Sequence, residues 1–94
     1  MNRFNIEELE ISNDRVKNQL TAFLNRVSMW KYHNDEMQMR VYVDSKGDFV
    51  YCEAVKYSLS FFSNAHKIRD LYESKYAPAV VQFQDFRDKV LSLV

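Results

Sequence analysis

The sequence is poor in the residues that break regular structure or cross-link a chain: its 94 residues include one glycine, one proline and one cysteine. With Gly47 as the single glycine, no glycine-rich phosphate-binding loop exists. The scarcity of glycine and proline also argues against low-complexity disorder. A lone cysteine cannot form an intramolecular disulfide, which is typical of a reducing compartment. We therefore expect a folded chain without a disulfide framework.

Net charge and long apolar runs are missing as well. The 13 basic residues balance the 13 acidic ones, which lowers the expectation of general polyanion binding. No apolar run approaches the length of a membrane span, and "MNRFNIEELEI" has acids where a secretory signal needs apolar residues. These features predict one cytoplasmic domain over residues 1–94, with no membrane partner.

Aromatic side chains are abundant, at 15% of the residues, and each ring buries much area in a small core. A first helix is predicted from about Asn13 to Tyr32, with Asn13 among three adjacent residues that can cap it. Residues 3–11 fit an extended piece or a single turn capped by Asn5. The inward face of the helix carries apolar residues at helical spacing: Val16, Leu20, Phe23, Leu24, Val27 and Trp30.

Residues 37–55 predict a β-hairpin around Asp44-Ser45-Lys46-Gly47, which fits a type I turn closed by a glycine bulge. In the register set by that loop, Val43 lies opposite Phe49 and Val41 opposite Tyr51. One face of the hairpin then carries almost only apolar residues and is predicted to cover the core. Its members are Met37, Met39, Val41, Val43, Phe49, Tyr51, Glu53 and Val55.

The second face of this predicted hairpin is also more apolar than contact with water requires. It pairs Tyr42 with Val50 and Arg40 with Cys52. Two large apolar side chains directly opposite each other form a patch, and we predict that a protein partner or a second copy covers it. The alternative cover is the N-terminal segment of the chain itself.

Two further helices are predicted, one over about Ser58–Lys75 and one from Pro78 to the C-terminus. Proline is favourable at the first helical position, and the short connection predicts that these helices form an antiparallel pair. The predicted fold class is α+β, in the order α-β-β-α-α. The hairpin packs on three helices, and a short N-terminal strand is compatible with this arrangement.

No catalytic or metal-binding motif stands out. His33 and His66 lack a His or Cys at ligand spacing. Arg40, as the expected neighbour of Cys52, would lower the pKa of the thiol, but a nucleophile also needs a base and an oxyanion site, and the sequence shows neither. We expect a protein that is not an enzyme and uses no cofactor or metal.

The first helix presents the clearest candidate binding surface. Between Arg15 and Asn34 the sequence has four basic residues and no acid, and Arg15 and Arg26 fall on one line of the helix with Met29 and Tyr32 beside it. This surface either contacts phosphates or an acidic protein, or is an ordinary solvated helix surface. A second stripe on the next helix either stacks with a partner or is peripheral core: Phe62, Arg69 and Tyr76.

Two functions from different classes are therefore predicted. The first is a non-enzymatic interaction module that binds and blocks, or adapts, a macromolecule. The second is an RNA or single-stranded DNA binding protein that uses the basic helix. In style the chain resembles small bacteriophage or mobile-element accessory proteins, many of which inhibit host enzymes or defence systems. The predicted partner-binding residues are Tyr42, Val50, Arg40, Arg15, Arg26, Met29 and Tyr32.

Overall fold

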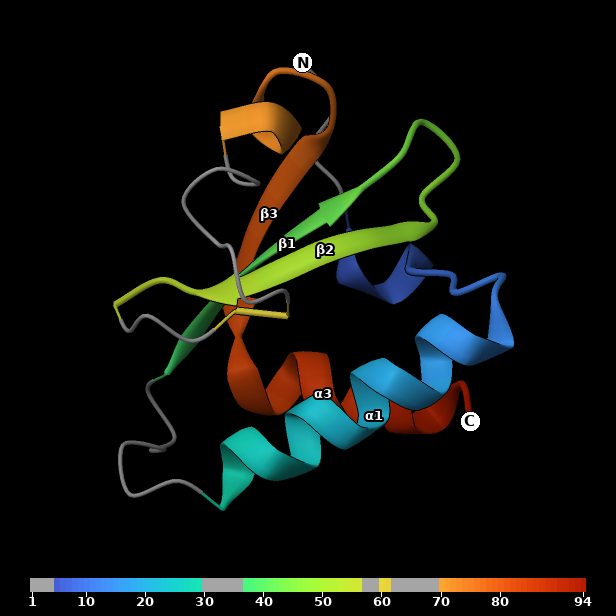
Figure 1. Cartoon of the computed structure of the whole chain (residues 1–94), viewed down its shortest axis with the longest axis vertical. Coiled ribbons are helices and arrows are strands. Elements are labelled where there is room, and N and C mark those ends of the chain that lie inside the picture. The colour runs from blue at the N-terminus through green and yellow to red at the C-terminus, as the bar shows by residue number, and fades with distance from the viewer. Residues whose placement is uncertain (1–4, 30–36, 57–59, 62–69) are drawn as a thin grey trace.

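The computed structural model describes residues 5–29, 37–56, 60–61 and 70–94, and it combines helices with an antiparallel sheet (Figure 1). This confirms the predicted α+β class. Residues 70–73 form a further short helical stretch. The elements in chain order are η1 (Ile6–Glu8), α1 (Asp14–Ser28), β1 (Gln38–Val43), β2 (Phe49–Ala54), β3 (Ala77–Gln82) and α3 (Phe83–Ser92).

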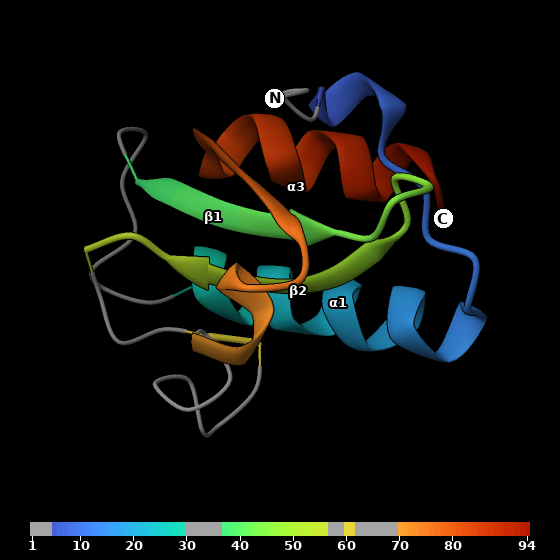
Figure 2. The same ribbon diagram turned by 90° about the horizontal axis from the view of Figure 1, so that it is seen from above.

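The sheet has three strands in the order β2-β1-β3, and both pairings are antiparallel. Helices α1 and α3 lie side by side under one face of the sheet, and the segment of residues 70–76 lies on the opposite face (Figures 1 and 2). We call these the helix-facing face and the second face. In Figure 2, α1 lies on the β2 side of the sheet and α3 on the β3 side.

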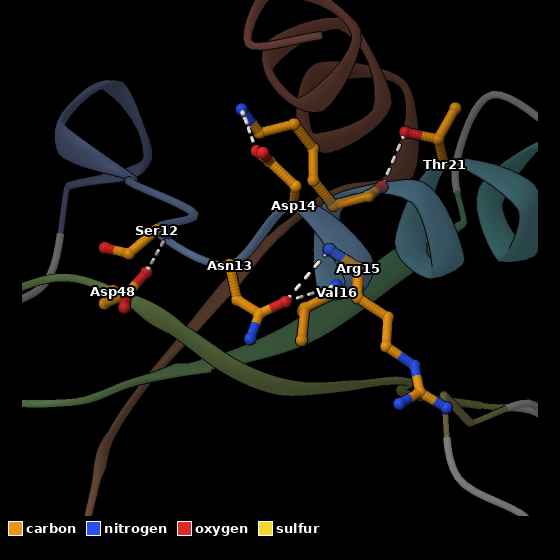
Figure 3. A network of polar contacts seen from close by, with 8 residues as sticks. Ser12, Asn13, Asp14, Arg15, Val16, Thr21 and Asp48 are labelled. Carbon is orange, nitrogen blue, oxygen red and sulfur yellow. Dashed lines mark hydrogen bonds and ion pairs between the residues drawn. The ribbon is translucent and has the colours of Figure 1, made fainter.

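Helix α1 begins as the sequence predicts. Asn13 is its N-cap, and the side-chain Oδ1 accepts hydrogen bonds from the backbone N–H groups of Arg15 and Val16 at 2.9 and 3.2 Å (Figure 3). The helix ends at Ser28 with Met29 as C-cap, so the predicted continuation to residue 32 falls outside the described residues, as does Trp30. The buried side chains of the helix follow the predicted stripe: Leu20, Phe23, Leu24 and Val27.

Within residues 5–11, the chain forms a single 3-10 turn followed by an extended piece, which agrees with the predicted single turn. Asn5 caps the turn by accepting the N–H of Glu7 at 3.0 Å. Glu10 then forms an isolated parallel bridge with Asp48, and its carbonyl accepts the N–H of Phe49 at 2.9 Å. This bridge covers the outer edge of β2 at the start of that strand.

The predicted hairpin turn is confirmed, whereas the predicted register is wrong beyond its first pair. Gly47 has φ 83° and donates its N–H to the carbonyl of Asp44 at 3.0 Å. Val43 lies opposite Phe49, but Tyr42 then lies opposite Tyr51, so that Val50 is an extra residue without a partner across β1. Such a bulge shifts all later pairs by one residue.

The bulge exchanges the faces of the rest of β2. Val41 lies opposite Cys52 and Arg40 opposite Glu53. Tyr51 therefore leaves the predicted core face, and Cys52 joins it in contact with the helices. The sheet residues of the main core are Met39, Val41, Val43, Phe49, Cys52 and Ala54.

The prediction that Pro78 opens a helix is wrong. Residues 77–82 form β3, which pairs with the free edge of β1 and places Ala79 opposite Val41. The run Val80-Val81 favours a strand because branched side chains suit a pleated surface. Helix α3 starts at Phe83, whose N–H donates to the carbonyl of Met37 at 2.7 Å. It packs beside α1, and most of the helix with which it is predicted to pair lies outside the described residues.

The predicted helix over 58–75 lies largely outside the described residues. Where the structure describes it, its start is not helical: Ser60 bridges to Glu53, and the N–H of Phe61 donates to the carbonyl of Cys52 at 3.0 Å. Residues 70–73 are helical as predicted. Within them Leu71 is 49% exposed and does not face inward, whereas Tyr72 does contact the sheet.

Candidate functional site

The second face of the sheet is covered by the chain's own tyrosines. Tyr42 and Tyr51 are fully buried, and the ring centroid of Tyr72 lies 6.4 and 5.4 Å from theirs. Tyr76 packs edge-on against Tyr72 at 5.4 Å. The prediction that Tyr42 meets a partner is therefore wrong, because residues 70–76 occupy that position.

The two other assumptions about this face are also corrected. Val50 is half-buried and does not lie opposite Tyr42. Of the N-terminal residues considered as the alternative cover, Ile6 packs against the core cluster on the helix-facing side and not on this face; Phe4 is not among the described residues.

A charged network joins the tyrosines. Glu53 is 2% exposed, accepts the hydroxyl of Tyr51 at 3.1 Å, and lies 3.4 Å from Arg40. The same guanidinium lies 3.7 Å from Glu73, which also accepts the hydroxyl of Tyr42 at 3.3 Å. A buried carboxylate is tolerated only when it is paired and hydrogen-bonded, so this network fastens residues 70–76 to the sheet.

The titration of these tyrosines fits a structural role. Burial, followed by the nearby Glu73 carboxylate, raises the pKa of Tyr42 to about 12. Burial also raises the pKa of Tyr51. Both hydroxyls are therefore protonated donors near neutral pH, and neither is suited to act as a base there.

Cys52 is fully buried on the helix-facing face, away from Arg40 in register. Burial, and then the adjacent Glu53, raises the pKa of the thiol well above its ordinary value. The expectation that Arg40 lowers this pKa is wrong. A thiol in this state is a small apolar core residue, not a nucleophile.

The outer surface of α1 remains as the predicted binding surface. We use this name for the exposed residues Arg15, Asn18, Ala22, Asn25, Arg26 and Met29. Met29 is 84% exposed, and Figure 3 shows the Arg15 side chain extending away from the capping contacts. Arg87 of α3 donates to Oδ1 of Asn25 at 3.2 Å, which brings a third guanidinium to the border of this surface. Tyr32 and His33 lie outside the described residues.

A hollow of about 270 Å³ borders the outer surface of α1. Arg26 stands on its rim, and the rings of Phe23 and Phe61 lie 5.9 Å apart, edge to face, in its lining. Gln19 completes the lining. The sequence reasoning missed this hollow because Phe61 comes from a segment distant in the chain, and no local pattern places it beside α1.

We also searched the described residues for metal sites and membrane-spanning helices. Among them, no group of three or more His, Cys, Asp or Glu is arranged to hold a metal ion. No helix in this part of the chain has the length and apolar character needed to cross a membrane. None of the protein-family models, curated proteins or solved structures compared with the chain matches it. The function is therefore argued from the geometry of the outer surface of α1.

Proposed function

We propose that the protein is a non-enzymatic interaction module that binds an acidic surface of another protein through the outer surface of α1, and thereby blocks or adapts that protein. The observation that carries the proposal is the exposure of Met29 three residues after Arg26, at the end of a helix surface that also carries Arg15. A large exposed apolar side chain next to cationic ones is a common composition for a protein-binding surface.

The charge of Arg15 supports binding better than it supports the helix itself, whereas Asp14 in the first turn and Arg26 in the last turn complement the helix dipole. No acid follows Asp14 within α1. Arg15 lies in the first turn, where the helix dipole disfavours a cation. Because Arg15 does not stabilise the helix through the dipole, recognition of an external carboxylate is the better explanation for a guanidinium at this position.

The neighbouring hollow supplies a place for an apolar side chain of the partner. Its aromatic lining is built from Phe23 and Phe61, and Arg26 stands at its rim. Burying an apolar anchor beside a charge pair is how a few residues dominate the affinity of an interface. Met29 adds a flexible, polarisable contact on the same helix.

The same proposal includes the source suggested by composition: a small bacteriophage or mobile-element accessory protein that inhibits a host enzyme or defence factor. The balance of 13 basic and 13 acidic residues supports a defined protein target over a general polyanion.

Affinity capture from nuclease-treated bacterial lysate tests the proposal. Arg15→Glu combined with Arg26→Glu should abolish capture of the partner seen with the wild-type chain. Lys46→Glu combined with Lys75→Glu makes the same change of net charge at exposed positions outside α1 and should leave capture intact. Equal loss in both double variants, or no loss in either, would contradict the assignment to α1.

The alternative function is binding of RNA or single-stranded DNA. The approach of Arg87 to Asn25 favours it, because three guanidinium groups then border one helix surface. Zero net charge opposes it, because affinity for phosphates grows with the number of cations presented. Capture that disappears with nuclease and weakens steeply with salt would favour this alternative over the protein-binding proposal.

A further inference from the structure

We propose that two copies of the protein pair through the outer edge of β3, antiparallel and with the two-fold axis at Val80, so that their sheets join into one. This inference is independent of the outer surface of α1. It concerns the outer edge of β3, and the partner that binds this edge is a second copy of the same chain.

The alternation of hydrogen bonds along the strands shows which backbone N–H and C=O groups of β3 point away from β1. The carbonyl of Gln38 accepts the N–H of Val55, on the β2 side, whereas the carbonyl of Met37 accepts the N–H of Phe83, on the β3 side. The register of β1 with β3 has no irregularity, and Arg40 lies opposite Val80 in it. Because hydrogen-bonded and non-hydrogen-bonded pairs alternate in an antiparallel ladder, the outward-pointing backbone groups of β3 belong to Pro78, Val80 and Gln82.

Among the described residues, the two edges of the sheet differ in what pairs with them. At β2, Glu10 bridges to Asp48 at one end, and Ser60 bridges to Glu53 at the other. At β3, none of the described residues pairs with the outer edge. An uncovered edge strand is a template for another strand.

The edge of β3 is self-complementary about Val80. In an antiparallel pairing centred there, Val80 exchanges two N–H···O=C bonds with Val80 of the other copy, and Gln82 of each copy donates its N–H to the carbonyl of Pro78 in the other. Pro78 has no N–H to return to Gln82. None is required, because Gln82 is the N-cap of α3 and its carbonyl accepts the first intrahelical bond.

This balance favours a second copy over an unrelated strand. A generic partner strand would present a carbonyl opposite Pro78 and leave it without a donor. Val80 is 54% exposed, and the pairing would set it against its counterpart. The copies do not repel each other through net charge, which is zero. The outer surface of α1 stays free, since α1 lies on the β2 side of the sheet (Figure 2).

Molar mass measured by light scattering across a concentration series tests the pairing. The wild-type chain should rise from one to two chain masses, and Val80→Lys should remain at one chain mass. Leu71→Lys introduces the same lysine at another exposed apolar position, 49% exposed, and should dimerise like the wild type. A wild-type chain that stays monomeric at millimolar concentration would overturn the proposal.

Amide hydrogen exchange and cross-linking give readouts specific to β3. The N–H groups of Val80 and Gln82 should become protected as concentration rises, and the Val80→Cys variant should form a disulfide-linked dimer on mild oxidation. The Cα atoms of a directly opposed pair lie about 5.5 Å apart, within the range of a disulfide, and the buried Cys52 does not compete. Leu71→Cys is the control and should not cross-link.

A dimer whose Val80 amide stays unprotected, or in which Leu71→Cys links as readily as Val80→Cys, would refute this pairing. If the chain is monomeric while the α1 charge reversals still abolish partner capture, the dimer proposal fails and the proposed function stands. If the dimer forms and the α1 charge reversals have no effect on capture, the dimer proposal stands and the proposed function fails.

Discussion

Arg40 and Glu53 face each other across β1 and β2, with the guanidinium 3.4 Å from a carboxylate that is 2% exposed. We expect Arg40→Ala to lower the free energy of unfolding by about 3 kcal/mol, because it removes the Arg40 guanidinium from its ion pair with a buried carboxylate. Urea denaturation followed by far-UV circular dichroism measures this change. Lys46→Ala, at an exposed position in the hairpin turn, should change the same quantity by less than about 0.5 kcal/mol.

A double-mutant cycle separates the ion pair from other effects of truncation. Glu53→Gln removes the buried charge, so adding it to Arg40→Ala should restore part of the lost stability. Additive losses in the double variant would show that Arg40 acts on stability through packing and not through Glu53.

The parts of the fold that could be predicted depend on local chemistry. Asn13 caps α1 and Asp44 organises the hairpin turn with hydrogen bonds to residues within four positions, so the sequence contains the full signal. The register of the hairpin could not be predicted in the same way. It depends on the bulge at Val50, which contains no glycine that would mark it in the sequence. The bulge is favoured because it places Cys52 and Ala54 in the core.

The sequence predicts a helix where the structure has β3 because two periodicities overlap in this segment. Ala79, Phe83 and Phe86 have helical spacing, and only the last two belong to α3. The adjacent residues Val80 and Val81 favour a strand. This segment becomes a strand because it pairs with the free edge of β1, and a contact between segments so far apart in the sequence cannot be predicted from local pattern. The same separation hid the cover of Tyr42, which comes from Tyr72.

The same distinction between local and tertiary contacts decides which parts of the candidate site could be predicted. The positions of Arg15, Arg26 and Met29 on the exposed side of α1 follow from helical spacing alone. The hollow beside Arg26 requires Phe61, which a hydrogen bond to Cys52 places at the end of β2. Tertiary contacts of this kind have no local signature.

Stability should fall as the solution becomes strongly alkaline. Burial raises the pKa of Tyr42 from its ordinary value of 10.0 to about 12, so the folded state holds its proton while the unfolded chain loses it. The contribution of Tyr42 is therefore complete below pH 10 and is lost as the pH rises through 12. Urea midpoints measured at about pH 9 and about pH 11 should differ less in Tyr42→Phe than in the wild type. An equal difference in the two proteins would argue against this burial.

Cys52 should be unreactive in the folded protein and sensitive to polarity. Its thiol is fully buried and its pKa is raised, so a thiol reagent should modify it only after denaturant is added. A cysteine introduced as Ser45→Cys, at an exposed turn position, should react at once and serves as the control. Cys52→Ser should lower stability by about 1–3 kcal/mol through an unpaired hydroxyl, and Cys52→Ala should lower it less. Rapid labelling of Cys52 in the native chain would contradict this placement.

Proline substitutions at adjacent positions of β3 should have opposite consequences for folding. Ala79 lies opposite Val41 at a hydrogen-bonded position, whereas the N–H of Val80 points away from β1. Ala79→Pro removes a ladder bond and leaves a buried carbonyl of β1 without its donor, at a cost of about 1–3 kcal/mol. Val80→Pro removes only an outward N–H, as Pro78 already does on the same edge. Thermal unfolding in dilute solution, where the chain is monomeric, should therefore show a lower Tm for Ala79→Pro than for Val80→Pro. The reverse order would mean that the hydrogen-bond parity of β3, and with it the outer edge assigned to Val80, is wrong.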